Sequence, residues 1–297
     1  MYLERSVPRL RHQVLVVALL LLIAPDVKTS DLFVITGATG VLGRQLARCA
    51  LNFESSAVMC GYRDSIKAKA LHDNLQHSPR AHFLPLDVDL CLSDDHSWNP
   101  TLQLHCASAE KVYLFNNAAV CLAGNTLCAI KESLMVNAVS PVQLSLSLIQ
   151  QLSSLGRGTD IHILNISSGE GESVFLNSGI ATELAVISTL DELKDYTAHL
   201  IANHDPNFEY AFGETPFYSL SKALLNKGTR LLHNLYFPKA RIVSICPGNF
   251  ISPMSTEEEI PSARSAYSAA ESVLEIALDS ARFPSGHFYR NGNIIDW

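Results

Sequence analysis

The chain has 297 residues, a formal net charge of −7 at pH 7, and 17% charged against 47% hydrophobic residues. This balance indicates a large buried core and excludes an intrinsically disordered chain; the acidic charge, without a Lys/Arg cluster, argues against nucleic acid as a partner. The seven cysteines form no C-x-x-C pair and the eleven histidines no H-E-x-x-H motif, so reduced thiols and no metal site are predicted.

The first 30 residues differ in composition from the rest of the chain. Three arginines precede an apolar run from Val14 to Ala24, which Pro25 ends. This run is shorter than the ~20 residues that a membrane-spanning helix needs, but a basic flank before a short apolar run is typical of a secretory signal or a marginal anchor. Residues 1–30 are therefore predicted to be a targeting or anchor segment, the alternative being an extra helix packed on the domain. The location stays open between the cytoplasm and association with the endoplasmic reticulum.

From Asp31 onward, short apolar and β-branched runs alternate with longer stretches of helical periodicity. Because the strand-like runs are apolar throughout and are separated by helix-length segments, they indicate a parallel sheet covered on both faces. The predicted fold class is α/β, a doubly wound parallel sheet in a single domain over residues 31–297, with ligands bound beyond the carboxyl ends of the strands. Strands are predicted at 32–37, 57–62, 81–87, 111–119, 160–168 and 240–248, and helices at 43–52, 133–155 and 218–235.

A glycine-rich turn separates the first predicted strand from the first helix. Gly37, Gly40 and Gly43 follow one another as G-x-x-G-x-x-G. Glycine permits a sharp turn and lets a diphosphate approach the backbone, and the amide groups and positive dipole at a helix start attract phosphate. The turn therefore predicts a dinucleotide site, the alternative being a turn needed only for close packing of helix against sheet.

The end of the second predicted strand bears on which dinucleotide is bound. An acidic residue here typically binds the ribose hydroxyls of NAD, whereas an arginine can pair with the 2′-phosphate of NADP. Gly61 and Tyr62 occupy the acidic position and Arg63 follows, which favours NADP over NAD. Asp64 leaves an alternative open, because its carboxylate can pair with Arg63 or bind the ribose itself.

Tyr218 and Lys222 lie four positions apart in a predicted helix, so one helix face presents both side chains. Alone, the pair is as compatible with an ordinary helix face as with a catalytic site. With the other motifs, taken in chain order, it resembles the short-chain dehydrogenase/reductase superfamily over residues 31–297. The other motifs are Thr36-Gly37-x-x-Gly40-x-x-Gly43, Asp87-Val88, Asn116-Asn117-Ala118-Ala119, Asn137, Ser168 and Pro247-Gly248.

The resemblance implies an NAD(P)-binding Rossmann-type domain in which four residues are catalytic. Tyr218 is implied as the general acid, Lys222 as the cation that lowers its pKa and holds the nicotinamide ribose, Ser168 as a hydrogen-bond donor to the substrate oxygen, and Asn137 as the holder of a proton-relaying water. Local alternatives are a helix cap for Asn137, a strand end for Ser168 and turn bonds for Asp87. Cofactor contacts are implied for Thr36, Gly37, Gly40, Val41, Leu42, Gly43, Arg63, Asp87, Val88, Asn117, Ala118, Tyr218, Lys222, Pro247, Gly248, Phe250 and Ser252.

Residues 169–217 lengthen the distance between Ser168 and Tyr218 to 50 positions (218 − 168). Such an insertion, like the closing segment "GHFYRNGNIIDW", resembles the monomeric carbonyl reductases and relatives that act on terpenoid or alkaloid ketones. Within it, Ser188 with Asp191, or Thr189 with Glu192, is spaced as a capping box before an amphipathic helix.

The subgroup resemblance implies a monomer that reduces a small-molecule ketone, aldehyde or quinone with NADPH, or oxidises the corresponding alcohol. One departure is Val41, which stands where the subgroup usually has its middle glycine, so that the spacing of Gly40 is like that of epimerase-type members. Two other functions therefore remain open: an epimerase-type enzyme on the same fold, and a non-catalytic dinucleotide-binding regulator or scaffold.

Overall fold

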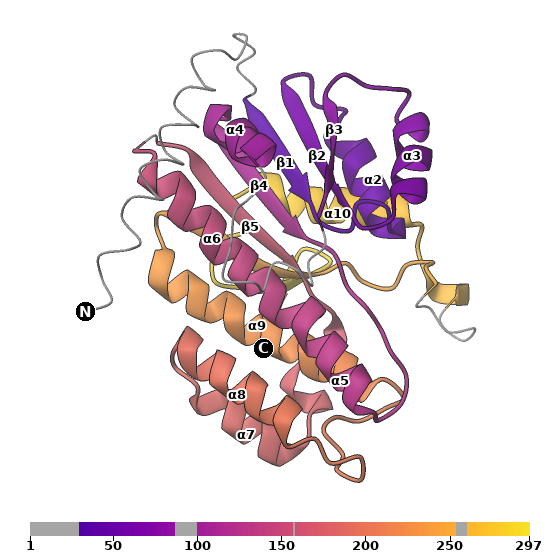
Figure 1. The fold of residues 1–297 in the computed structure, drawn as a ribbon, viewed down its shortest axis with the longest axis vertical. Coiled ribbons are helices and arrows are strands. Elements are labelled where there is room, and N and C mark those ends of the chain that lie inside the picture. Colours follow the sequence, from indigo (N-terminus) through magenta and orange to yellow (C-terminus); the bar gives the residue numbers. More distant parts are fainter. Residues whose placement is uncertain (1–29, 87–99, 157, 254–259) are drawn as a thin grey trace.

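The structure is a computed structural model that describes residues 30–86, 100–156, 158–253 and 260–297. The described residues form one sheet with the strand order β3-β2-β1-β4-β5-β6-β7-β8, and helices cover both of its faces (Figure 1). Neighbouring strands pair in parallel from β3 to β7, and β8 pairs with β7 in antiparallel fashion. The strands are β1 Asp31–Ile35, β2 Ser56–Tyr62, β3 Ala81–Pro85, β4 Lys111–Asn116, β5 Asp160–Ile166, β6 Ala240–Cys246, β7 Phe288–Arg290 and β8 Asn293–Ile295.

The sheet confirms the predicted doubly wound α/β fold, including a strand within each of the six predicted runs. The chain returns to the middle of the sheet between β3 and β4, so the strand order reverses between β1 and β4. In open α/β sheets, ligands bind outside the carboxyl ends of the strands at such a switch point. The helices are α2 Val41–Ala50, α3 Ser65–Asn74, α4 Pro100–Ser108, α5 Leu127–Leu134, α6 Ser140–Ser154, α7 Ser178–Val186, α8 Leu190–Ala202, α9 Pro216–Tyr236 and α10 Ala266–Leu278.

Each face of the sheet has its own apolar core, which explains why the strands are apolar throughout. Successive strand residues point to opposite faces. Phe33 and Ile35 of β1 therefore pack with α2 and α10, whereas Leu32 and Val34 pack with α4 and α6. Covering both faces removes the polar alternation that a half-exposed strand would show.

The helix predicted at 133–155 is confirmed as a continuous helical stretch, but it begins earlier, at Leu127, and contains a π-helical turn. α5 begins after its cap residue Thr126 and ends at Leu134, a π-helical turn spans Met135–Val139, and α6 starts at Ser140. Pro141 is the physical reason, since it has no N–H to donate to the carbonyl of Asn137 four residues earlier. Single π-helical turns are frequent at functional sites, and this one contains Asn137.

The insertion at 169–217 forms α7 and α8, which lie beside α9 in Figure 1. A third apolar cluster joins the two helices to α5 and α9, with Leu193 and Leu200 of α8 packed among its members. The Thr189–Glu192 capping box is confirmed: the Thr189 side chain accepts from Glu192 N, and the Glu192 carboxylate accepts from Thr189 N.

The end of the chain closes the sheet and contacts the insertion. The ring of Trp297 packs on Phe288 with centroids 5.9 Å apart, and its carbonyl accepts from Ser173 N at 3.4 Å. In the described part of the chain, every helix is too short or too polar to cross a membrane. The predicted anchor run from Val14 to Ala24 lies outside the described residues.

Candidate active site

The turn after β1 is tied to the end of β4 by Thr36 and Asn117. The buried Thr36 hydroxyl accepts from the backbone N–H groups of Asn117 and Ala118, both at 2.9 Å. Asn117 Nδ2 donates in return to the carbonyls of Thr36 at 2.9 Å and Gly37 at 3.2 Å. These bonds fix the glycine turn directly at the switch point between β1 and β4.

The three glycines of the turn differ in how much space an added Cβ would find. Gly37 has φ +60°, and a Cβ added there would lie 2.9 Å from Ala118 Cα, so both its conformation and its space require glycine. A Cβ on Gly43 would lie 2.5 Å from the Gly37 carbonyl oxygen and 2.8 Å from Ala38 Cα. At Gly40 the nearest atom is that same oxygen, at 3.2 Å, so a small side chain fits with little adjustment.

The start of α2 fits the phosphate groups of a dinucleotide. Gly40 is its N-cap residue and offers no side-chain hydrogen bond. The first backbone hydrogen bond of the helix is the one that Arg44 N donates to Gly40 O. The amide groups of Val41, Leu42 and Gly43 therefore lie at the positive end of the helix without an intrahelical acceptor, as anion binding requires.

Arg63 and Asp64, which follow β2, have different surroundings. The Asp64 carboxylate caps α3, accepting from Ile66 N at 2.9 Å and Lys67 N at 3.1 Å. Both bonds use Oδ1 and hold the carboxylate at the helix start, and Oδ2 lies 4.0 Å from Lys67 Nζ. Arg63 is exposed beside it. Asp87 and Val88, two of the implied cofactor contacts, lie outside the described residues.

Tyr218, Lys222 and Ser168 come together at the carboxyl ends of β5 and β6. Pro216 starts α9, so Tyr218 lies in its first turn and Lys222 one turn later, facing the end of β5. Lys222 Nζ donates to the carbonyl of Ile166 at 2.8 Å and lies 5.4 Å from the centroid of the Tyr218 ring. The Ser168 hydroxyl, two residues after Ile166, lies beside the Tyr218 hydroxyl and lowers its pKa. The three predicted catalytic side chains are thus neighbours.

Burial dominates the electrostatics of this group. It raises the pKa of Tyr218 well above its usual value; Glu170 adds to the increase, and the Ser168 hydroxyl opposes it. Burial lowers the pKa of Lys222 to about 8, against smaller opposing effects from Cys121, Cys246 and Glu170. The net effect raises the pKa of Tyr218, whereas Lys222 was expected to lower it. The protein alone therefore keeps the phenol protonated.

Asn137 uses its side chain to hold protein groups. Its Oδ1 accepts from Val120 N at 2.9 Å, and its Nδ2 donates to Val120 O at 2.8 Å and to Ser221 Oγ at 2.9 Å. Both amide hydrogens are therefore used, and the side chain fixes the segment after β4 against α9. The proton-relaying water stays a prediction. Because both amide hydrogens are used, Asn137 would have to bind this water through a carbonyl oxygen, of its side chain or of its backbone.

Glu170 is a site residue that the sequence analysis missed. Its N–H donates to Ser168 Oγ at 3.3 Å, and its Oε2 accepts from Ser219 Oγ at 2.9 Å, next to Tyr218. Gly171 makes this position possible, because a Cβ there would lie 2.9 Å from the backbone of Lys222. A glutamate two residues after a serine carries no spacing signal, so only the fold identifies it.

The loop after β6 contains the remaining predicted contacts. Gly248 has φ +72°, which favours glycine, and Phe250 forms an isolated bridge with Arg264. The Arg264 guanidinium donates to the carbonyl of Pro247 and, at 2.8 Å, to Ser272 Oγ of α10. Arg264, also missed by the sequence analysis, thus holds the segment from Pro247 to Ser252 beside α10.

Comparison with known proteins gives one family and several similar folds. A family model described as short chain dehydrogenase matches residues 31–198, more than half of the chain. The matched segment includes Asn137 and Ser168 and ends before Tyr218. A comparison with curated protein sequences gave no match.

Solved structures with the same fold include three reductases. Salutaridine reductase from Papaver somniferum is 23% identical, with a TM-score of 0.72, covering 87% of this chain and 99% of its own. An NADPH-bound carbonyl reductase from chicken fatty liver is 21% identical, with a TM-score of 0.64, covering 91% and 100%. The carbonyl reductase Sniffer of D. melanogaster is 17% identical, with a TM-score of 0.60, also covering 91% and 100%.

Proposed function

The chain belongs to the short-chain dehydrogenase family, and we propose that it is an NADP-dependent oxidoreductase that reduces the carbonyl of a ketone, aldehyde or quinone to an alcohol. One observation carries the proposal: a protonated phenol, a serine hydroxyl and a buried ammonium meet at the edge of the sheet where the glycine turn also lies. The fold shared with salutaridine reductase and two carbonyl reductases agrees with it.

The proton for the reaction comes from Tyr218. A reduced nicotinamide cofactor held at the glycine turn would supply the hydride. Ser168 Oγ holds the carbonyl oxygen by a hydrogen bond, and the Tyr218 hydroxyl donates its proton to that oxygen as negative charge develops there. Because burial and Glu170 raise the pKa of Tyr218, the phenol starts in its donor form. This favours reduction over the reverse reaction, which needs the phenolate.

Lys222 contributes a positive charge below the phenol. With a pKa of about 8, it is mostly protonated at neutral pH. As the proton leaves Tyr218, this charge stabilises the phenolate that remains. Its bond to the carbonyl of Ile166 fixes the ammonium at the end of β5, 5.4 Å from the centroid of the Tyr218 ring.

NADP, in preference to NAD, is the proposed cofactor. Arg63 follows β2 on the exposed surface, where a 2′-phosphate would be reached, and the Asp64 carboxylate is engaged as the cap of α3. A guanidinium binds a phosphate by paired, charge-assisted hydrogen bonds, which a ribose hydroxyl cannot offer.

A monomeric state is proposed because the insertion covers α5 and α9. In similar enzymes without such an insertion, the helices at these positions form a four-helix contact between subunits. Here α7 and α8 bury their apolar residues in the cluster that includes Phe217 and Leu224 of α9. A single species of about 32.5 kDa in light scattering supports this state, and a dimer at low concentration contradicts it.

The described residues after Gly248 form α10 and the strands β7 and β8 of the same sheet, and they leave the epimerase alternative open. A non-catalytic regulator stays open until turnover is measured.

The direct test is NADPH oxidation by the full chain with a panel of quinones, isatin-like diketones and bulky terpenoid ketones. Turnover that prefers NADPH to NADH supports the proposal. Binding of NADPH without turnover of any carbonyl contradicts the enzymatic part and favours the regulator. Absence of binding contradicts the cofactor assignment as well.

A further inference from the structure

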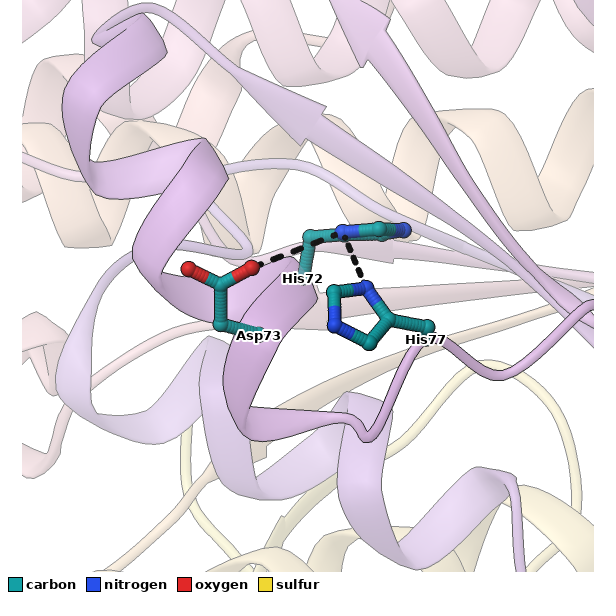
Figure 2. Close-up of side chains that lie close together, drawn as sticks. All are labelled: His72, Asp73 and His77. Carbon is teal, nitrogen blue, oxygen red and sulfur yellow. Dashed lines mark hydrogen bonds and ion pairs between the residues drawn. The ribbon is translucent and has the colours of Figure 1, made fainter.

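The end of α3 gathers three side chains with metal-binding atoms. His72 and Asp73 belong to its last turn, and His77 lies in the turn that follows (Figure 2). Their nearest ligand atoms all lie within 4.8 Å of one another. This surface is separate from the catalytic group, which lies at the ends of β5 and β6.

The backbone, not chance rotamers, brings the two imidazoles together. His77 N donates to His72 O at 3.3 Å and Gln76 N donates to Asp73 O at 3.1 Å, which are the two bonds of a Schellman motif. Gln76 and His77 both have positive φ, 54° and 52°. In this motif the residue after the left-handed position folds back on the third-last helical residue, usually by an apolar contact. Here both residues are histidines.

The three side chains are already close to the geometry of a metal site. His72 Nδ1 and His77 Nδ1 are 3.0 Å apart, and His72 Nδ1 lies 3.8 Å from Asp73 Oδ1. Ligand atoms of a tetrahedral zinc ion, at bond lengths of about 2.0–2.1 Å, are separated by roughly 3.3 Å. Small rotations of the side chains therefore suffice to place all three atoms around one ion.

Electrostatics and access also favour a cation here. The negative end of the α3 dipole lies at this turn, with carbonyl groups that have no helical donor. Asp73 adds a carboxylate, of which Oδ2 pairs with Lys69 at 3.3 Å and Oδ1 faces His72. The side chains of His72 and Asp73 are 42% and 49% exposed, so waters can complete the coordination.

We propose that His72, Asp73 and His77 form a surface site for one divalent transition-metal ion of the Zn²⁺, Ni²⁺ or Cu²⁺ class. Two imidazoles and one carboxylate suit these ions, whereas Mg²⁺ and Ca²⁺ prefer all-oxygen ligands. The bound ion ties the turn to the last helical residues and so stabilises the end of α3 and the left-handed pair that follows it.

The experiment is a calorimetric titration of tag-free, chelator-treated full chain with NiCl₂ and, separately, MgCl₂. A Cys128→Ser background removes an exposed thiol, which would compete for the metal. We expect one Ni²⁺ per chain and no saturable binding of Mg²⁺. His77→Asn, which keeps a residue tolerant of positive φ, is expected to weaken binding about tenfold or more, since even outer-shell changes at metal sites cost roughly 10–100-fold.

A second histidine pair provides the matched control. His82 and His105 have ring centroids 4.3 Å apart and, in the described residues, belong to no three-ligand group. The double variant His82→Gln, His105→Gln is expected to bind Ni²⁺ as the parent does. Lys69→Ala is expected to strengthen binding, because it removes the cation that competes for Asp73.

Two readouts decide the proposal. In the parent, Ni²⁺ is expected to raise the unfolding temperature, and in His77→Asn it is not. No saturable binding, or binding that His72→Gln and His77→Asn both leave unchanged, overturns the proposal. Neither result depends on NADPH or on turnover, so the site is tested separately from the proposed enzymatic function.

Discussion

The cofactor side and the substrate side of the sheet edge are built in different ways. Around β1 and α2 the site is made by backbone: Gly37 and Gly43, where an added Cβ would clash, and amides at a helix start. Around β5 and α9 it is made by side chains, with Lys222 buried beneath Tyr218 and Glu170 beside it. The backbone part tolerates few substitutions and determines which ligand is bound. The side-chain part determines the proton transfer and the pH range over which it works.

Removing the Tyr218 hydroxyl tests the side-chain half with the largest expected effect. Tyr218→Phe keeps the ring over Lys222 but deletes the proton donor, so turnover is expected to fall by roughly 10²–10⁴-fold. Affinity for NADPH, measured by fluorescence titration, is expected to change little. Tyr196→Phe is the matched control, because that hydroxyl bonds Glu183 in the insertion, away from the catalytic group. Equal turnover in parent and Tyr218→Phe would refute the mechanism.

Two alanine substitutions in one turn test the backbone half. Gly43→Ala places a Cβ against the backbone of Gly37 and Ala38, so the turn must shift, and we expect a loss of about 1–3 kcal/mol in stability together with weaker NADPH binding. Gly40→Ala meets one atom at 3.2 Å and is expected to change both quantities less. Thermal unfolding with and without NADPH measures both. The reverse ranking would show that the cofactor, not packing, selects the glycines.

The contrast explains how far the sequence alone could predict this protein. Strands, glycine turn and the Tyr218–Lys222 pair are local patterns, and each is recognisable because backbone geometry fixes its spacing. The π-helical turn at Asn137 is not visible in the sequence pattern, and Pro141 explains it only once the turn is seen.

Other parts of the site depend on contacts between distant segments. Glu170 and Arg264 act through Ser219 and Pro247, which are 49 and 17 positions away in sequence. No periodicity encodes such pairs. The histidine cluster was missed for a different reason: it depends on a left-handed turn at Gln76, and glutamine is not a typical residue there.

Arg63→Ala tests how sharply the cofactor side distinguishes its ligands. A charge-assisted hydrogen bond to a phosphate contributes about 1.5–3 kcal/mol, so the preference of kcat/KM for NADPH over NADH is expected to fall by roughly 10–100-fold. The expected change lies in the NADPH value, with NADH nearly unaffected. Lys67→Ala is the control, because it removes a positive charge from the exposed face of α3. Arg80→Ala is not suitable, since Arg80 binds several carbonyls of the α2–β2 turn. An unchanged ratio would remove Arg63 from the cofactor site.

Glu170→Gln gives the smallest expected change and the most specific one, because it alters charge and leaves shape. Glu170 raises the pKa of both Tyr218 and Lys222, so its neutralisation lowers both. Reduction needs both groups protonated, and activity is therefore lost as pH rises through the lower pKa, that of Lys222 at about 8. The variant is expected to lose activity at a lower pH than the parent.

The acid side of the same profile distinguishes electrostatics from structure. Below the pKa of Lys222 both groups stay protonated in parent and variant, so kcat is expected to converge there. The amide oxygen that Glu170→Gln introduces can still accept the bond from Ser219, which keeps the turn after Ser168 in place. A uniform loss of kcat at every pH would mean that Glu170 positions Ser168. A shift confined to the alkaline limb would mean that the substrate side uses this carboxylate to extend the pH range over which Tyr218 can donate.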